Sequence, residues 1–203
     1  STAWPCRAAE TMAKGPEHFE DVKNAARACR VCQPVFDHPC RPIIRGTSTS
    51  LIRIISQAPG ATAHALDEPF RDPSGKRLRD WMGVSEAAFF NEDLVAITPM
   101  GFCYPGHHKG TDKPPRPECA PLWQARCDAA LKSVRLTLLI GAHAQRWALG
   151  GRAAKTLTET VSQWRTHGPE IAALPHPSGR NNVWLARNPW FENDVLPALR
   201  QRI

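Results

Sequence analysis

Short apolar runs separated by longer amphipathic segments dominate the hydrophobic pattern of this chain. Four runs have the length and composition of buried strands, and they occupy residues 51–55, 94–97, 136–140 and 171–174. Segments between and around them have helical spacing of apolar positions, among them residues 17–29, 74–82, 117–133, 142–149 and 153–164. Asn188 and Pro189 supply a cap and a first-turn proline for a last helix that extends to the C-terminus.

This alternation of strands and helices predicts the fold class. Strands that alternate with helices form a parallel sheet with helices on both faces, so we expect a three-layer α/β/α fold around a four-stranded parallel sheet. The length of 203 residues, with no internal repeat or low-complexity linker, favours a single domain over residues 1–203. Residues 1–28 would form an N-terminal extension that ends in a helix.

Each predicted strand is followed by a turn, and these turns are the candidate site. Ligand crevices in open α/β sheets form at the carboxyl ends of the strands. The four turns begin at Ser56, Thr98, Gly141 and His176. The last is the most informative, because Pro175 and Pro177 stiffen the backbone around His176. Two polar residues just after it, Ser178 and Arg180, are suited to hold phosphate.

Charge is unevenly distributed along the chain. The net charge is +7, and residues 1–100 balance 12 basic against 12 acidic side chains, whereas residues 101–203 carry 14 basic and 7 acidic ones. A basic half indicates a polyanionic partner, most often nucleic acid, or else a solvated basic surface. No apolar run approaches the ~20 residues of a membrane span, and the start lacks a signal pattern. We therefore expect a cytoplasmic protein without a membrane partner.

The seven cysteines have a spacing that suggests metal ligation rather than disulfides. Cys29 and Cys32 form a C-x2-C pair, and Cys103 and Cys119 are 16 residues apart. Two such pairs could hold zinc or a [4Fe-4S] cluster equally well, and free buried cysteines are the third possibility. Cys6, Cys40 and Cys127 have no assigned role, although Cys40 is close enough in sequence to compete as a ligand.

Six motifs occur in one order along the chain. They are Cys29-x2-Cys32, Gln57-Ala58-Pro59-Gly60, Glu68-Pro69-Phe70 with Gly75, the pair Cys103 and Cys119, the run at residues 138–142, and His176-Pro177-Ser178. In this order they resemble the uracil-DNA glycosylase superfamily, most closely its iron–sulfur branch, usually called family four. The resemblance covers residues 28–203, which is most of the chain.

The resemblance implies a structural cofactor and a DNA partner. The cofactor would be a [4Fe-4S] cluster on Cys29, Cys32, Cys103 and Cys119, with zinc as the alternative, pinning the N-terminal helix and the loop between the last two cysteines. The partner would be DNA that contains uracil or abasic sites, and the protein would be a monomer. The implied activity is that of a monofunctional glycosylase, which flips uracil out of the helix and leaves an abasic site.

Site roles follow from the same resemblance. His176 would donate a hydrogen bond to uracil O2 as the base departs with negative charge, and Phe70 would stack on the flipped base. The turn of Ala58, Pro59 and Gly60 would bind the substrate. Ser178, Gly179 and Arg180 would press on the DNA backbone, and further phosphate contacts are expected from Arg187, Lys109 and Lys113.

Two positions depart from the family pattern. Gln57 stands where a catalytic glutamate usually precedes Ala-Pro-Gly. As a catalytic residue, glutamine could orient water, but it neither takes a proton nor supplies negative charge. Pro99 stands where an asparagine is expected to recognise uracil, and proline offers no such hydrogen bond. His64, Asp67 or Glu68 could replace the missing group, with His64 preferred. Asn181, like Asn182, could read a base edge or cap the last turn.

These departures keep a second function open. The alternative to a glycosylase is a protein that binds damaged or abasic DNA with little or no turnover. A weaker third possibility is a zinc-stabilised interaction protein.

Overall fold

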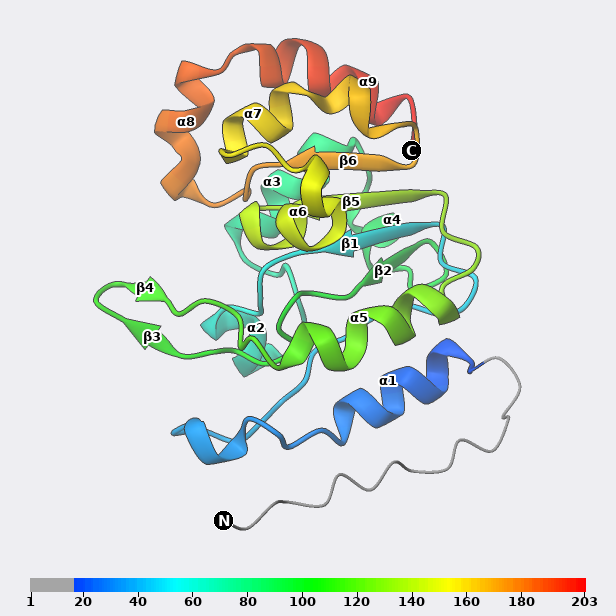
Figure 1. The fold of residues 1–203 in the computed structure, drawn as a ribbon, viewed down its shortest axis with the longest axis vertical. Coiled ribbons are helices and arrows are strands. Elements are labelled where there is room, and N and C mark those ends of the chain that lie inside the picture. Colours follow the sequence, from blue (N-terminus) through cyan, green and yellow to red (C-terminus); the bar gives the residue numbers. More distant parts are fainter. Residues whose placement is uncertain (1–16) are drawn as a thin grey trace.

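A four-stranded parallel sheet lies at the centre of the computed structural model, which describes residues 17–203. Its strands are β1 (Ile52–Ile55), β2 (Val95–Ile97), β5 (Leu136–Ile140) and β6 (Ile171–Leu174), in the order β2-β1-β5-β6. All neighbouring strands are parallel. Helices cover both faces of the sheet (Figure 1), so the predicted three-layer α/β/α fold and its four strands are confirmed.

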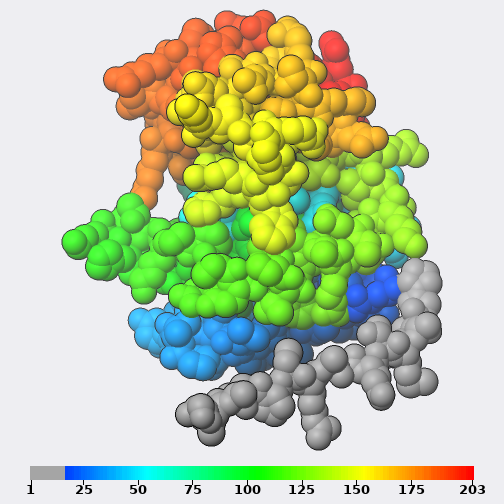
Figure 2. Space-filling view, in the orientation of Figure 1, coloured from blue at the N-terminus to red at the C-terminus, as the bar shows by residue number. Residues whose placement is uncertain are grey.

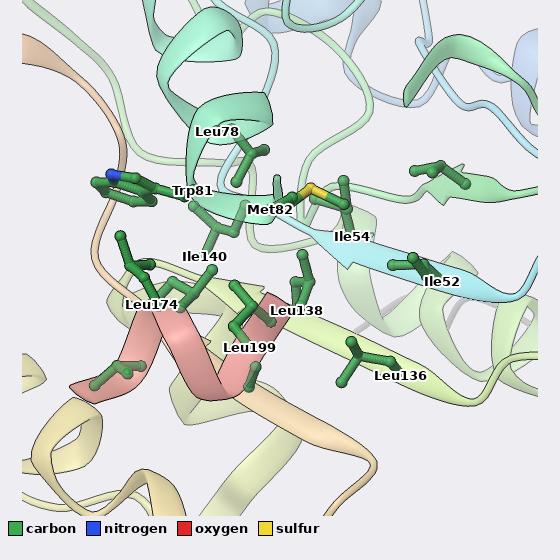
Figure 3. Close-up of a cluster of buried hydrophobic side chains, with 14 of the residues drawn as sticks. Ile52, Ile54, Leu78, Trp81, Met82, Leu136, Leu138, Ile140, Leu174 and Leu199 are labelled. Atoms are coloured by element: carbon green, nitrogen blue, oxygen red, sulfur yellow. The ribbon is translucent and has the colours of Figure 1, made fainter. Parts of the chain in front are cut away.

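Side chains alternate between the two faces of the sheet, as the pleat requires. On one face, Ile54 and Leu138 pack with Leu78 of α3 (Pro73–Met82) and Leu199 of α9 (Leu196–Arg200), as Figure 3 shows. On the other face, Leu139 packs against α5 (Cys119–Ala130) and α6 (Ala142–Leu149). Burial on both faces explains why the strands appear in the sequence as predominantly apolar runs, with only Arg53 in β1 and Thr137 in β5 as polar exceptions.

Helix α1 (Phe19–Arg27) forms an outer layer on α5. Phe19, Val22 and Ala26 are fully buried, and they share a cluster with Trp123 and Cys127 of α5. This packing ties the N-terminal segment to the sheet through α5. The first 16 residues of the predicted extension, with Cys6, lie outside the described residues.

The remaining elements are short. They are α2 (Ala61–Leu66), α4 (Glu86–Phe90), α7 (Leu157–Ser162), α8 (Asn182–Arg187), a π-helix (Phe191–Val195), and 3-10 turns at Gln33–Val35, Gly150–Arg152, Trp164–His167 and Gly179–Asn181. The single helix predicted over residues 153–164 is wrong, because Thr156 begins α7 with a capping box and Gln163 ends it. The last predicted helix is a π-helix that continues into α9.

A small hairpin, absent from the sequence prediction, projects from the carboxyl edge of the sheet. Strands β3 (His107–His108) and β4 (Thr111–Asp112) pair antiparallel. Lys109 and Gly110 at the tip have φ of +46° and +77°, and two successive residues with positive φ are what a type I′ hairpin turn requires. In Figure 2 the hairpin (green) extends from the body of the molecule, and the segment near residue 180 reaches down to it.

None of the helices within residues 17–203 is both long enough and apolar enough to span a bilayer.

Candidate functional site

A cavity of about 570 Å³ opens at the carboxyl edge of the sheet, which is within the usual size range of ligand sites. Three of the four predicted turns line it, contributing Gln57 after β1, Pro99 after β2 and His176 after β6. The turn after β5 does not line it, and His143 of that turn is exposed to solvent. The three turns lie together because all strands of the sheet are parallel, and their carboxyl ends therefore meet at one edge.

The His176 ring is fixed as a neutral hydrogen-bond donor. The backbone N–H of Ser178 donates to Nδ1 over 3.3 Å, so the ring proton belongs on Nε2. Burial lowers the pKa of His176 from its ordinary value, against an opposing effect of the Asp72 and Asp112 carboxylates. The imidazole is therefore neutral near pH 7, and within residues 17–203 its Nε2–H donates to no protein group.

Two neighbouring side chains hold the turn that carries His176. Asn181 donates from Nδ2 to the backbone oxygen of His176 over 2.6 Å. Arg77 of α3 donates to the backbone oxygen of Ser178 over 3.2 Å and to the side chain of Asn182 over 2.9 Å. Both predicted readers of a base edge thus have structural partners, although Asn181 also lines the cavity.

Phe70 lines the cavity from the segment before α3. Its backbone φ is +60°, a left-handed conformation that is uncommon for an aromatic residue. Arg79 donates to its backbone oxygen over 3.1 Å, and its ring meets Phe89 edge-on with centroids 5.9 Å apart. A Cβ on Gly75 would lie only 1.8 Å from the same oxygen. The glycine of this motif therefore allows the backbone that presents the Phe70 ring.

The two positions that depart from the family pattern both line the cavity. The Gln57 side chain has no hydrogen-bond partner among residues 17–203, so its amide is free to bind water or a ligand. Pro99 presents its ring to the cavity, while its backbone oxygen accepts a hydrogen bond from Gln124 over 2.8 Å. Neither side chain carries charge into the site.

The residues suggested as substitutes for the missing carboxylate lie elsewhere. His64 is on α2 but does not line the cavity, since its ring packs beside His38 and Tyr104 with centroids 4.7 and 5.8 Å away. Glu68 accepts two hydrogen bonds from Arg71, at 2.6 and 3.0 Å, which lower its pKa. Asp67 is exposed. The structure therefore corrects the preference for His64 as the substitute. The side of α2 that carries His64 faces away from the cavity.

Acidic side chains enter the cavity at two places that sequence reasoning missed. Asp72 caps α3 by accepting from the backbone N–H of Gly75 over 3.0 Å. Asp112 comes from the hairpin with His107, whose Nδ1 lies 3.2 Å from an Asp112 oxygen. The Asp72-Pro73 pair was a visible helix-start signal. The role of Asp112 had no sequence signal, because a two-residue strand pair has no periodicity.

The predicted phosphate contacts differ in their relation to the cavity. Arg180 and Lys113 line it, and Arg180 donates to the backbone oxygen of Gly110 at the hairpin tip. Gly179 is exposed beside Arg180, in the turn after Ser178. Arg187 and Lys109 are exposed but do not line the cavity. Of the predicted phosphate contacts, Arg180 and Lys113 therefore lie at the cavity, whereas Arg187 lies outside it at the end of α8.

The cysteines gather around a second, smaller cavity between α1 and α5. Its lining includes all four predicted ligands and the additional Cys40. The backbone N–H of Phe102 donates to Sγ of Cys119 over 3.2 Å. Burial, and then the neighbouring Cys32 and Cys29, raise the pKa of Cys119 to about 12. Burial and the nearby Cys40 thiol also raise the pKa of Cys103.

The donor set of this second cavity fits a thiolate-bound group. Burial is the main cause of the raised pKa values, with a smaller contribution from the neighbouring cysteines, and a positive metal centre would favour the thiolate form instead. The geometry is not that of a preformed site, since no group of three or more metal-ligating side chains within residues 17–203 is arranged around one ion position. The four predicted cysteine ligands therefore lie around one cavity, but their side chains are not arranged in a coordination geometry.

Comparison with known families agrees with this architecture. Residues 45–200, which contain all four strands of the sheet and every segment that lines the large cavity, match the family model described as the uracil DNA glycosylase superfamily. The matched region leaves out Cys29, Cys32 and Cys40.

Proposed function

Because the chain belongs to the uracil DNA glycosylase superfamily, and is thus a DNA-binding hydrolase of base excision repair, we propose that it removes uracil from DNA. The reaction breaks the bond between uracil N1 and the deoxyribose C1′ and leaves an abasic site. One observation carries the proposal: a neutral His176, whose Nδ1 is occupied by Ser178, supplies its Nε2–H at a cavity beside Phe70.

The chemistry requires stabilisation of two opposite charges. Negative charge develops on the departing uracil, and a fixed donor aimed at a developing anion is worth ~3–4 kcal/mol. The Nε2–H of His176 is such a donor, because burial keeps the ring neutral and its tautomer is set by Ser178. Positive charge develops on the sugar, and Gln57 offers only an amide dipole to it.

Base entry uses the remaining lining of the cavity. The base must leave the helix, at a cost of a few kcal/mol, and stacking on an aromatic ring repays ~1–3 kcal/mol per base. Phe70 provides this ring, and the turn of Ala58, Pro59 and Gly60 forms the adjacent lining. Ser178 and Arg180 lie at the same cavity, where the DNA backbone would approach.

A base-release assay with enzyme in excess over a uracil-containing duplex tests this function. We expect release of uracil, with strand breaks only after alkali, and a loss of at least 100-fold in rate for H176A. The matched control is H143A, which removes an exposed histidine at the end of the neighbouring strand, outside the cavity. Equal rates for H176A and the wild type would contradict the mechanism.

A second function is favoured by Gln57 and Pro99. A cavity without a charged side chain at the first position and without an amide at the second is suited to hold an abasic site or damaged base without turnover. In the same assay, tight and salt-sensitive binding without base release by the wild type would support this alternative.

For the smaller cavity, we propose that Cys29, Cys32, Cys103 and Cys119 hold a [4Fe-4S] cluster, with zinc as the alternative. The bound group would supply a covalent cross-link between the segment after α1 and the start of α5. Metal and sulfide analysis of the purified protein decides between the two: iron with equivalent sulfide supports the cluster, and stoichiometric zinc supports the alternative. Loss of that metal in C29S, with the fold of the sheet retained, would support the ligand assignment.

A further inference from the structure

The β3–β4 hairpin brings a carboxylate to the cavity whose first turn carries the uncharged Gln57. Asp112 lines the cavity together with Gln57 and His176. Its Oδ2 faces the turn after β1, since a Cβ built on Gly60 would lie 3.5 Å from that oxygen. A side chain 52 residues after Gly60 therefore contributes to the cavity lining beside the turn after β1.

The two oxygens of Asp112 have different surroundings. Oδ1 lies 3.2 Å from Nδ1 of His107 across the hairpin. Oδ2 accepts no hydrogen bond from any group within residues 17–203. One oxygen is therefore oriented by an imidazole, and the other is available to a water molecule or a ligand in the cavity.

Two hydrogen bonds fix the hairpin, one between its own two ends and one to the segment that follows His176. The backbone N–H of Lys113 donates to the oxygen of Gly106 over 2.9 Å and closes its base. At its tip, the oxygen of Gly110 accepts a hydrogen bond from Arg180, which follows the His176 turn. The position of Asp112 is thus linked to the segment that carries His176.

The other acids near the cavity have structural partners that explain them. Asp72 caps α3, and Glu68 is paired with Arg71. Asp112 is paired with His107 through Oδ1 only, and its Oδ2, beside the turn after β1, accepts no hydrogen bond from residues 17–203. A carboxylate here also opposes the approach of DNA phosphates, to which Arg180 and Lys113 are suited. Its presence is explained if a positive charge forms beside it during the reaction.

The charge of Asp112 affects His176 in the same cavity. It acts to raise the pKa of His176, together with Asp72 and against burial. The charged and titratable side chains that line the same cavity are Arg71, Asp72, His107, Lys113, His176 and Arg180.

We propose that Asp112 is a catalytic residue of the glycosylase reaction and that His107 is its positioning residue, an inference that rests on the proposed function. As the C1′–N1 bond breaks, its electron pair leaves with the base, and Asp112 stabilises the cationic sugar. A water oxygen then bonds to C1′ while its proton passes to the free Asp112 oxygen. Protonation of the uracil anion from solvent and return of the Asp112 proton to solvent complete the hydrolysis.

Single-turnover uracil release by the full chain tests this assignment. We expect D112N to slow release by about 100-fold or more while binding abasic DNA at least as tightly as the wild type. H107A should slow release about fivefold, and H107Q, which keeps an N–H donor, should restore much of the rate. The matched control is H108A, which removes the adjacent exposed histidine that does not line the cavity.

A third variant separates the two cavity carboxylates. D72N removes the charge of Asp72 but keeps its capping oxygen, so we expect it to fold normally and to retain more activity than D112N. An active wild type with unaffected D112N overturns this inference alone. Loss of release in D72N but not in D112N assigns the role to Asp72 and also overturns it. A wild type that releases no uracil overturns the proposed function and this inference together.

Discussion

Asn181 donates a hydrogen bond from its side-chain Nδ2 to the backbone oxygen of His176 over 2.6 Å. The residue expected to read a base edge is thus bound to the turn that presents the imidazole. Its position in a 3-10 turn after Ser178 makes this possible, because the turn folds the chain back over the preceding residues. We therefore expect Asn181 to affect base release through the orientation of His176.

Removal of this hydrogen bond should lower the rate of base release without altering base preference. We expect N181A to slow single-turnover release about fivefold, since a net intramolecular hydrogen bond is worth ~1 kcal/mol. The assay is release of uracil with enzyme in excess, run beside V183A, which changes an exposed residue of α8. A changed ranking of deaminated bases in N181A would instead show that the Asn181 amide reads the base.

The lowered pKa of His176 should be visible in both titration and stability. Burial lowers it below the ordinary value, so the unfolded chain binds the proton at a pH where the folded chain does not. The stability contributed by this group is present above about pH 6.5 and is lost as the pH falls toward the folded pKa. H176N should lose less stability than the wild type between pH 7.5 and 5.5.

Imidazole NMR titration measures the same property directly. We expect the measured pKa of His176 to lie below the ordinary pKa of histidine. If the ring were solvated or paired with Asp112, its pKa would be at or above about 6.5. The latter result would contradict the neutral-donor mechanism.

The conformation of Phe70 should depend on Gly75. A Cβ at this position would meet the Phe70 backbone oxygen at 1.8 Å, and backbone atoms cannot rotate away. We expect G75A to lower the free energy of unfolding by about 1–3 kcal/mol and to slow uracil release by loss of stacking. The control is G151A, where a Cβ meets nothing within 4 Å. Equal unfolding midpoints in urea for the two variants would contradict this prediction.

The sheet and most of the cavity could be predicted from the sequence because both follow from local patterns. Each of the four strands is a predominantly apolar run, interrupted only by Arg53 in β1 and Thr137 in β5, and the turn after a parallel strand must lie at the carboxyl edge. The position of His176 and of Gln57 follows from this topology alone. All four turns lie at this edge, but the turn at Gly141 does not line the cavity, because α6 begins immediately after it and His143 is exposed to solvent.

What the sequence could not show depends on contacts between distant segments. The hairpin has two residues in each strand and no hydrophobic pattern, so nothing indicated that Asp112 would lie near Gly60. His64 was preferred because loop acids such as Asp67 and Glu68 commonly form surface ion pairs, but α2 turns the His64 ring toward His38 and Tyr104. The sequence allowed Cys40 as a competing ligand, and the structure places it in the same cavity as the other four cysteines.

Salt dependence of DNA binding should separate Arg180 from other arginines. Each phosphate neutralised contributes about −0.9 to the slope of log affinity against log salt. R180A should therefore reduce the slope by about one and weaken binding to abasic and undamaged duplexes by the same factor. R152A, which removes an exposed arginine in the 3-10 turn after α6, should leave the slope unchanged. Fluorescence anisotropy at several salt concentrations measures these slopes. If R180A weakened binding at every salt concentration without changing the slope, Arg180 would act by holding the hairpin through Gly110 and not by neutralising a phosphate.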